Sequence, residues 1–99
     1  MKKYAMFFGF TQQGIEKIKE SPARVAAAKK IVQSMGGKVT DFYGLMGMTS
    51  FDTLFIIEAP DDDVVAKSAL AIASKGNVRT TTVRAFTEDE FKQVIDKLV

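Results

Sequence analysis

The chain contains no cysteine and no histidine among its 99 residues. Without cysteine it can form no disulfide framework and carries no thiolate nucleophile. Without either residue, a Cys/His zinc site and a histidine-ligated haem are excluded, and no imidazole base is available near neutral pH. We therefore predict no metal site and no resident cofactor. Any catalysis would depend on carboxylates, tyrosines, lysines, hydroxyls or a borrowed cofactor.

The sequence also lacks an excess of charge of one sign and any long apolar run. Its 14 basic and 12 acidic residues leave a net charge of +2, and their even spread gives no electrostatic footprint for nucleic acid. No stretch approaches the roughly 20 apolar residues that span a bilayer. We therefore predict a cytoplasmic protein with no nucleic-acid or membrane partner, in which residues 1–99 form one domain.

What the sequence does contain is a regular succession of strand and helix patterns. Strand patterns occupy residues 4–10, 39–43, 54–57 and 78–86. A short helical pattern follows the first strand, and a second helix is predicted to begin with Ser21 as N-cap and Pro22 at its first position. A third helix follows the acidic residues 61–63, and a capping box at residues 87–90 starts a fourth. Gly36-Gly37 should end the second helix and Gly76-Asn77 the third.

This order is β-α-β-β-α-β-α, which predicts an α+β, ferredoxin-like fold with an additional C-terminal helix. The four strands should form one antiparallel sheet in the spatial order 4-1-3-2. In such a fold the two crossover helices lie on the same face of the sheet.

Three of the strands carry apolar side chains on both faces. In the first strand, Met6 and Phe8 point to one side while Ala5 and Phe7 point to the other. The face without helices would expose roughly 500 Å² or more of apolar surface, around or above the largest patch that a typical monomer carries. The sequence therefore predicts a homodimer or higher oligomer through this face.

Four polar residues in or beside the strands are candidates for a small-molecule site: Tyr43, Asp52, Arg79 and Arg84. A carboxylate in an apolar strand must be paired, hydrogen-bonded, protonated or at the sheet margin. Asp52 and Tyr43 could move a proton, and the arginines could hold an anionic group. The structural alternatives are a carboxylate that accepts backbone hydrogen bonds, an interface tyrosine and arginines that protect an edge strand.

Three functions remain open after these observations. The first is a non-catalytic, homo-oligomeric module that binds a small molecule or regulates other proteins. The alternative is a small cofactor-independent barrel enzyme, an oxygenase or isomerase acting on an aromatic or carbonyl compound. The third is RNA binding through sheet aromatics such as Phe7, Phe51 and Phe55, although the third strand lacks the basic-glycine-aromatic pattern of RNA-recognition domains.

Several spaced blocks of the sequence resemble the GYD-domain family. The blocks lie at residues 20–25, 36–43, 58–62, 76–80 and 85–86 and together span nearly the whole chain. The family consists of small bacterial and archaeal proteins similar to the dimeric α/β-barrel superfamily, and their biochemical function is not established. The resemblance implies a ferredoxin-like fold and a face-to-face dimer. The family's Gly-Tyr-Asp signature is here Ser50-Phe51-Asp52, so only the aspartate is retained.

Overall fold

The computed structural model describes all 99 residues and contains one four-stranded sheet. Its strands are β1 (Lys2–Phe10), β2 (Lys38–Gly44), β3 (Thr53–Ala59) and β4 (Val78–Ala85). They lie in the order β2-β3-β1-β4, and each neighbouring pair is antiparallel. The predicted α+β class, strand order and antiparallel pairing are confirmed.

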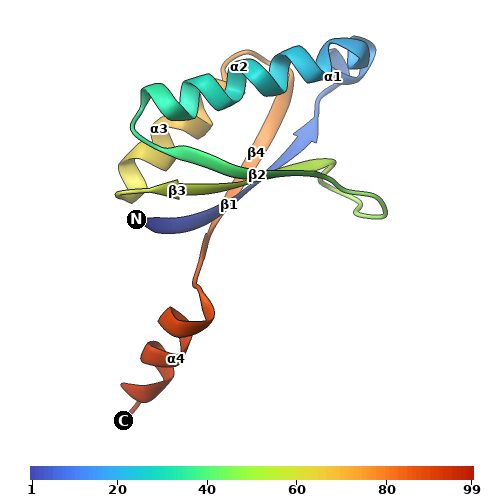
Figure 1. Cartoon of the computed structure of the whole chain (residues 1–99). Helices are drawn as coiled ribbons and strands as arrows, with labels where there is room; N and C mark the ends of the chain where they lie inside the picture. Colours follow the sequence, from blue (N-terminus) through green and yellow to red (C-terminus); the bar gives the residue numbers. More distant parts are fainter.

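The helices are α1 (Gln12–Glu16), the 3₁₀ turn η1 (Ile18–Glu20), α2 (Ser21–Ser34), α3 (Asp62–Ala73) and α4 (Glu88–Asp96). Helices α2 and α3 lie side by side on one face of the sheet, and α4 lies beyond the opposite face (Figure 1). The C-terminal helix that the sequence adds to the ferredoxin-like pattern is therefore present. None of the helices combines the length and the apolar character that crossing a bilayer takes.

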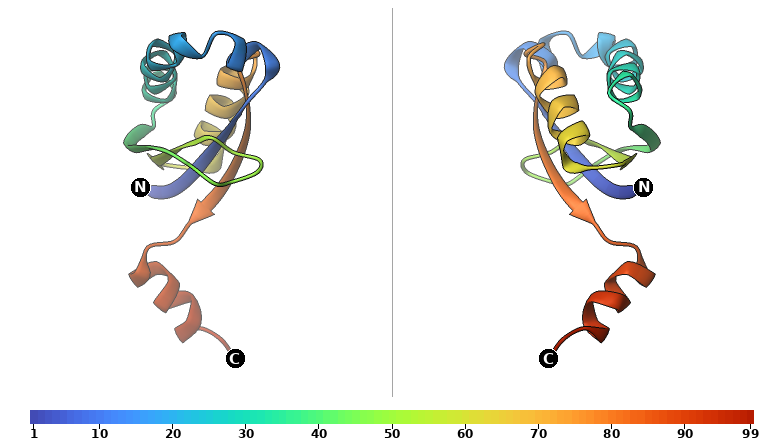
Figure 2. Two further views of the ribbon diagram at one scale, coloured as in Figure 1. Left: turned by 90° about the vertical axis from the view of Figure 1, so that its right-hand side faces the viewer. Right: turned by 90° about the vertical axis from the view of Figure 1, so that its left-hand side faces the viewer.

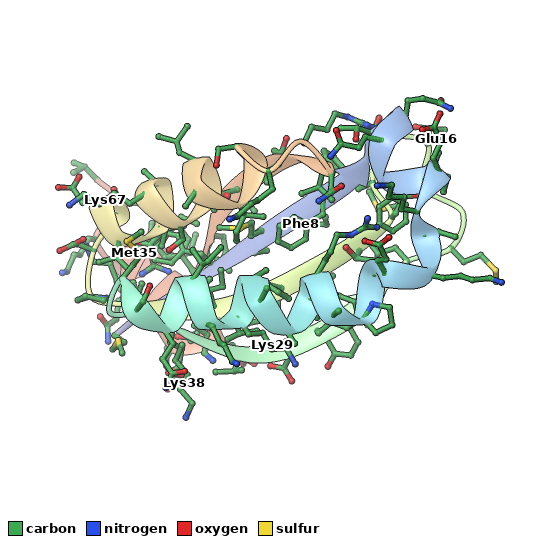
Figure 3. All side chains as sticks on the ribbon, turned by 90° about the horizontal axis from the view of Figure 1, so that it is seen from above. Phe8, Glu16, Lys29, Met35, Lys38 and Lys67 are labelled. Atoms are coloured by element: carbon green, nitrogen blue, oxygen red, sulfur yellow. The ribbon has the colours of Figure 1, made fainter.

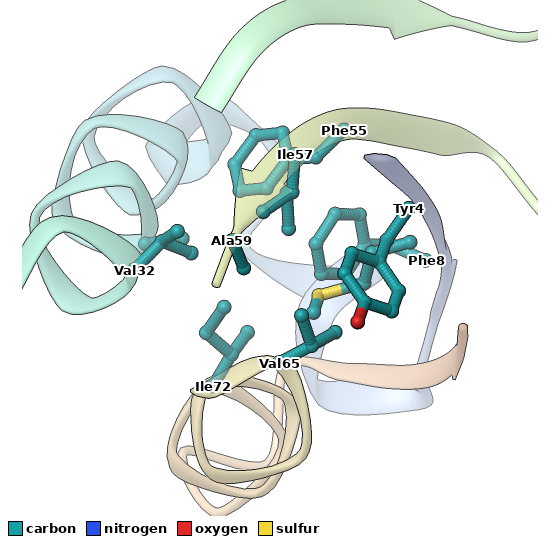
Figure 4. Packing of buried hydrophobic residues seen from close by; sticks show 10 residues of the cluster. Tyr4, Phe8, Val32, Phe55, Ile57, Ala59, Val65 and Ile72 are labelled. Atoms are coloured by element: carbon teal, nitrogen blue, oxygen red, sulfur yellow. The ribbon is translucent and has the colours of Figure 1, made fainter. Parts of the chain in front are cut away.

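The core lies between the sheet and the pair α2 and α3, as the close-up of the buried side chains shows (Figure 4). From the sheet it takes one set of alternating residues on β1 and one on β3, while the helices add Ala28, Val32, Val65 and Ile72. The strand residues in the core are Tyr4, Met6, Phe8, Phe55, Ile57 and Ala59. Only 14 of the 99 residues are buried, so the core of the isolated chain is thin.

Helix ends follow the predicted signals at several points. Gly36 and Gly76 follow α2 and α3 with φ values of 101° and 84°, a conformation that glycine adopts without steric penalty. Asp61 caps α3 by accepting a hydrogen bond from the Val64 amide. Thr87 and Glu90 form the predicted capping box of α4, in which each side chain accepts the other residue's amide hydrogen.

The start of α2 differs from the prediction. The N-cap is Glu20, which makes no side-chain capping bond, and Ser21 is the first helical residue. The predicted helical segment after β1 divides into α1 and η1, and η1 runs directly into α2. Because Ser21 has helical dihedral angles (φ −54°, ψ −44°), its hydroxyl is not placed to cap the next turn. The expectation that Ser21 is the N-cap was therefore wrong by one residue.

Helix α4 gives the molecule an elongated outline. It has no buried residue, and two side views show it standing clear of the sheet at the end of a short extended segment (Figure 2). The radius of gyration is 14.6 Å, against about 13 Å for a compact chain of this length. Its apolar residues Phe91, Val94, Ile95 and Leu98 are all exposed, so the helix has an amphipathic pattern without a partner in its own chain.

Candidate functional site

The face of the sheet that carries no helix is apolar. We call it the open face and define it by the apolar residues that alternate with the core positions on β1, β3 and β4: Ala5, Phe7, Leu54, Ile56 and Val83. The first four are half-buried by their neighbours within the sheet, and Val83 is 46% exposed. The ring of Phe51, in the loop before β3, packs on Phe7 with ring centroids 5.4 Å apart. The open face therefore combines aromatic and aliphatic groups that no element of this chain covers.

Two of the predicted site residues, Asp52 and Arg79, lie at one end of this face, on either side of Gly9 in β1. Gly9 pairs with Arg79 of β4, and Asp52 immediately precedes Thr53, the residue that pairs with Phe8. Asp52 Oδ2 accepts a hydrogen bond from the Phe10 amide at 2.9 Å. The Asp52 amide in turn donates to the Phe8 carbonyl at 2.8 Å. Asp52 therefore continues the hydrogen-bond ladder between β1 and β3 past Thr53, the first residue of β3.

Arg79 reaches across β1 toward the same loop. Its guanidinium donates to the Phe10 carbonyl at 3.1 Å and to the Ser50 carbonyl at 2.5 Å. A side chain at Gly9 would leave no room for this arrangement, since a Cβ atom there would lie 2.6 Å from the Arg79 guanidinium carbon and 2.6 Å from the Ser50 oxygen. The arginine thus ties β4, β1 and the β2–β3 loop together.

Tyr43 lies at the β2 edge, and the register places its side chain on the open face. It pairs with Leu54 of β3 and is 54% exposed. Its hydroxyl makes no hydrogen bond to another group of the chain, whereas Asp52 and Arg79 are bonded to backbone atoms around Phe10. Tyr43, Asp52 and Arg79 thus share one end of the sheet.

The structure does not bring Arg84 together with these three residues. It lies five residues beyond Arg79 along β4, a separation of about 17 Å in an extended strand, and it pairs with Tyr4 on the helix-covered face. Arg84 Nη2 forms a 2.8 Å salt bridge with Glu90 Oε2. The Thr87 amide bond and then the Arg84 bond lower the pKa of Glu90 to about 2. Arg84 therefore connects β4 to α4.

A hydrogen bond on the helix-covered face joins the buried Tyr4 to the exposed Asp62. The Tyr4 hydroxyl donates a 2.5 Å hydrogen bond to Asp62 Oδ1 at the start of α3. This bond, with burial as the second cause, raises the pKa of Tyr4 from its ordinary value of 10.0 to about 12. The pair was not predicted, since the two residues are 58 positions apart and Asp62 reads in the sequence as one of three helix-start carboxylates.

The raised pKa of Tyr4 predicts a loss of stability at alkaline pH. Below pH 10 the phenol is neutral in both states, and the stabilisation is fully present. Between pH 10 and about 12 the unfolded chain ionises while the folded chain does not, so the free energy of unfolding falls as pH rises. Urea unfolding of the wild type and Tyr4→Phe at about pH 9 to 11.5 measures this difference. A fall in stability that is equally steep for both proteins would contradict the assignment.

No group of three or more aspartate, glutamate, cysteine or histidine side chains is arranged to hold a metal ion. Two of the predicted site residues, Asp52 and Arg79, make hydrogen bonds to backbone atoms at one end of the open face. What this surface can do chemically is bury apolar area against another surface.

Comparison with known proteins bears on the nature of this surface. The sequence model of the GYD domain matches residues 4–95. A protein of Thermus thermophilus, named glutamine synthetase and cystathionine beta-lyase binding protein, is 28% identical over 86 residues. The matched segment covers 86% of this chain and 88% of that protein.

Proposed function

Because the chain belongs to the GYD-domain family, we propose that it is a homodimer that binds other proteins and regulates them without turning over a substrate. The observation that carries the proposal is the open face, an apolar sheet surface that the chain's own helices leave uncovered. Transfer of apolar area out of water stabilises association by about 25 cal/mol per Å² before the entropic costs of binding. The cytoplasm is the compartment that we propose.

A second copy of the chain is the partner that fits the open face. Two such faces related by a twofold axis present the same residues to each other, so an apolar centre meets an apolar centre. The thin core of one chain gives a reason for the assembly, since only 14 of 99 residues are buried before association. Stacking of the two sheets would give each subunit a second apolar layer.

Helix α4 supports the same arrangement. It lies on the open-face side of the sheet (Figure 1), and its apolar residues Phe91, Val94, Ile95 and Leu98 are between 45% and 71% exposed. In a dimer with stacked sheets, a projecting helix on that side comes within reach of the other subunit. The salt bridge from Arg84 to Glu90 fixes the first turn of α4 relative to β4. The helix therefore has a defined position on this side of the sheet.

The similarity to the Thermus protein supports the binding role. That protein is named for binding two enzymes, and the aligned segment covers most of both chains. We therefore propose enzymes of the same two kinds as partners of this chain. With the open faces buried in a dimer, the outer surfaces of α2 and α3 and the sheet edges remain free for such a partner.

The contacts of Asp52 and Arg79 support a structural role for both residues. Asp52 Oδ2 accepts a hydrogen bond from the Phe10 amide, which holds the carboxylate against the β1 backbone. Both terminal nitrogens of Arg79 donate to backbone carbonyls. We propose that these two residues hold the end of the sheet in shape and that Tyr43 belongs to the rim of the dimer interface.

A binding measurement tests this function. Purified chain is titrated against glutamine synthetase and against cystathionine beta-lyase of its own source organism by biolayer interferometry. We expect at least one enzyme to bind with a dissociation constant of about 10 μM or tighter and to change its catalytic rate when the chain is added. Absence of binding to both enzymes at that concentration would overturn the proposed partners.

A further inference from the structure

The helix-covered side of the sheet contains a pocket that the dimer does not use. It has a volume of about 290 Å³ and lies between α2 and the end of the sheet where β1 stops. Its floor consists of four phenylalanines from three strands: Phe8, Phe10, Phe42 and Phe55. In the view from above, Phe8 is visible between the two helices (Figure 3). The floor rings meet edge to face, with centroids 4.9 Å apart for Phe8 and Phe55 and 5.9 Å apart for Phe42 and Phe55.

Helix α2 contributes two alanines to the lining of the pocket. Val25, Ala27, Ala28 and Ile31 line it, and alanine does not reach across the space between a helix and a sheet. In the second half of the same helix, Val32 is fully buried and packs into the core. The pocket therefore lies directly beside the packed core.

The mouth of the pocket is cationic. Arg24 and Lys75 are the charged residues of the lining, which contains no acidic side chain. Arg24 is held in place by the Gly14 carbonyl, which accepts a hydrogen bond from it at 3.0 Å, and by Asn77 Oδ1 at 3.5 Å. Both acceptors are neutral.

The charge of Arg24 is therefore not balanced within the chain. The two salt bridges of the structure join Lys3 to Glu58 and Arg84 to Glu90, and neither involves a residue of the pocket. A partly buried guanidinium that touches only neutral oxygens attracts an anion more strongly than one that is already paired.

From these observations we infer that the pocket binds a small aromatic or branched aliphatic carboxylate. The apolar body of the ligand lies on the four phenylalanines, and its carboxylate lies at the mouth between Arg24 and Lys75. The volume is at the low end of the range for ligand pockets, about 300 to 1,000 Å³, which suits a ligand with one ring. An effector role of this ligand toward the bound enzyme rests on the proposed function. Binding of the ligand to the pocket does not depend on that function.

The test compares a carboxylate with its neutral isostere. ¹⁵N-labelled wild-type chain is titrated with 3-phenylpropionate and with 3-phenylpropionamide, and chemical shifts are followed by NMR. We expect 3-phenylpropionate to shift the amides of pocket residues such as Phe55 and Ala28, and to bind about tenfold more tightly than the amide, since hydrogen bonds between two charged groups are stronger than those to a neutral acceptor.

Two variants and one control test whether Arg24 and Lys75 bind the carboxylate of the ligand. Arg24→Gln and Lys75→Gln should each weaken binding of the carboxylate while leaving that of the amide unchanged. Lys30→Gln, on an exposed position of the same helix outside the pocket, should change neither. Lys75 is exposed, so its substitution tests the inference even if Arg24→Gln disturbs the fold.

The inference is overturned if carboxylate and amide bind equally, if shifts cluster on the open face instead, or if neither compound binds at millimolar concentration. These outcomes leave dimerisation and enzyme binding untouched, because those are measured separately and without the ligand.

Discussion

Replacement of Val83 by arginine is expected to convert the proposed dimer into monomers. Val83 is the most exposed apolar residue of the open face at 46%, and a twofold interface contains two copies of the substitution. An unpaired charge buried in an apolar interface costs several kcal/mol, so the dissociation constant should rise by at least about a thousandfold. Sedimentation velocity at micromolar concentration measures the change.

Ile15→Arg is the matched control for this experiment. Ile15 is 48% exposed, almost the same as Val83, but it lies on α1 on the helix-covered side of the sheet (Figure 1). It should leave the dimer intact. If Val83→Arg stays dimeric, or if both variants dissociate alike, the open face is not the interface.

Phe55→Ala should cause the largest loss of stability of any single truncation in the core. The side chain is only 1% exposed and contacts the rings of both Phe8 and Phe42. Truncation of a buried phenylalanine to alanine typically costs about 3 to 5 kcal/mol, a large share of the roughly 5 to 15 kcal/mol that a small domain has in total. Urea unfolding at equal protein concentration measures the loss, because dimer stability depends on concentration.

The control for this truncation is Leu70→Ala. Leu70 is 72% exposed on α3, and removal of an exposed apolar group changes stability by about 0.5 kcal/mol or less. A loss below about 1 kcal/mol for Phe55→Ala would show that this ring does not hold the sheet to the helices.

The sequence predicts the fold because its local signals agree with one another. Gly36 and Gly76 end helices, Asp61 and Thr87 start them, and the structure places all four at those positions. The expected positions of the strands leave a single right-handed ferredoxin-like order, which is the order observed. The alternation of Phe7 and Phe8 likewise predicts that both faces of the sheet are apolar.

The candidate site is harder to predict because it depends on register and on contacts between distant residues. Arg79 and Arg84 look alike in the sequence, but they are five residues apart on β4, so their side chains lie on opposite faces of the sheet. The same separation places them toward opposite ends of the strand. The bond from Asp52 to the Phe10 amide and the bond from Tyr4 to Asp62 join residues 42 and 58 positions apart. Nothing in the local sequence marks these pairs.

The pocket under α2 also escapes sequence reasoning. Val25 and Ala28 belong to the apolar stripe that predicts packing of this helix against the sheet, and the stripe does not say whether the space before it is filled. Only the separation of α2 from the phenylalanines of the sheet reveals the hollow. The helical pattern predicts that Arg24 faces outward, but its guanidinium donates hydrogen bonds to the Gly14 carbonyl and to Asn77 Oδ1.

The subunit count of the unmodified protein tests the central claim most directly. Native mass spectrometry of freshly purified wild-type chain at micromolar concentration should give a mass of two chains, each of 10.9 kDa. A spectrum dominated by the mass of one chain would contradict the account, because it would show that the open face and α4 meet water without a partner.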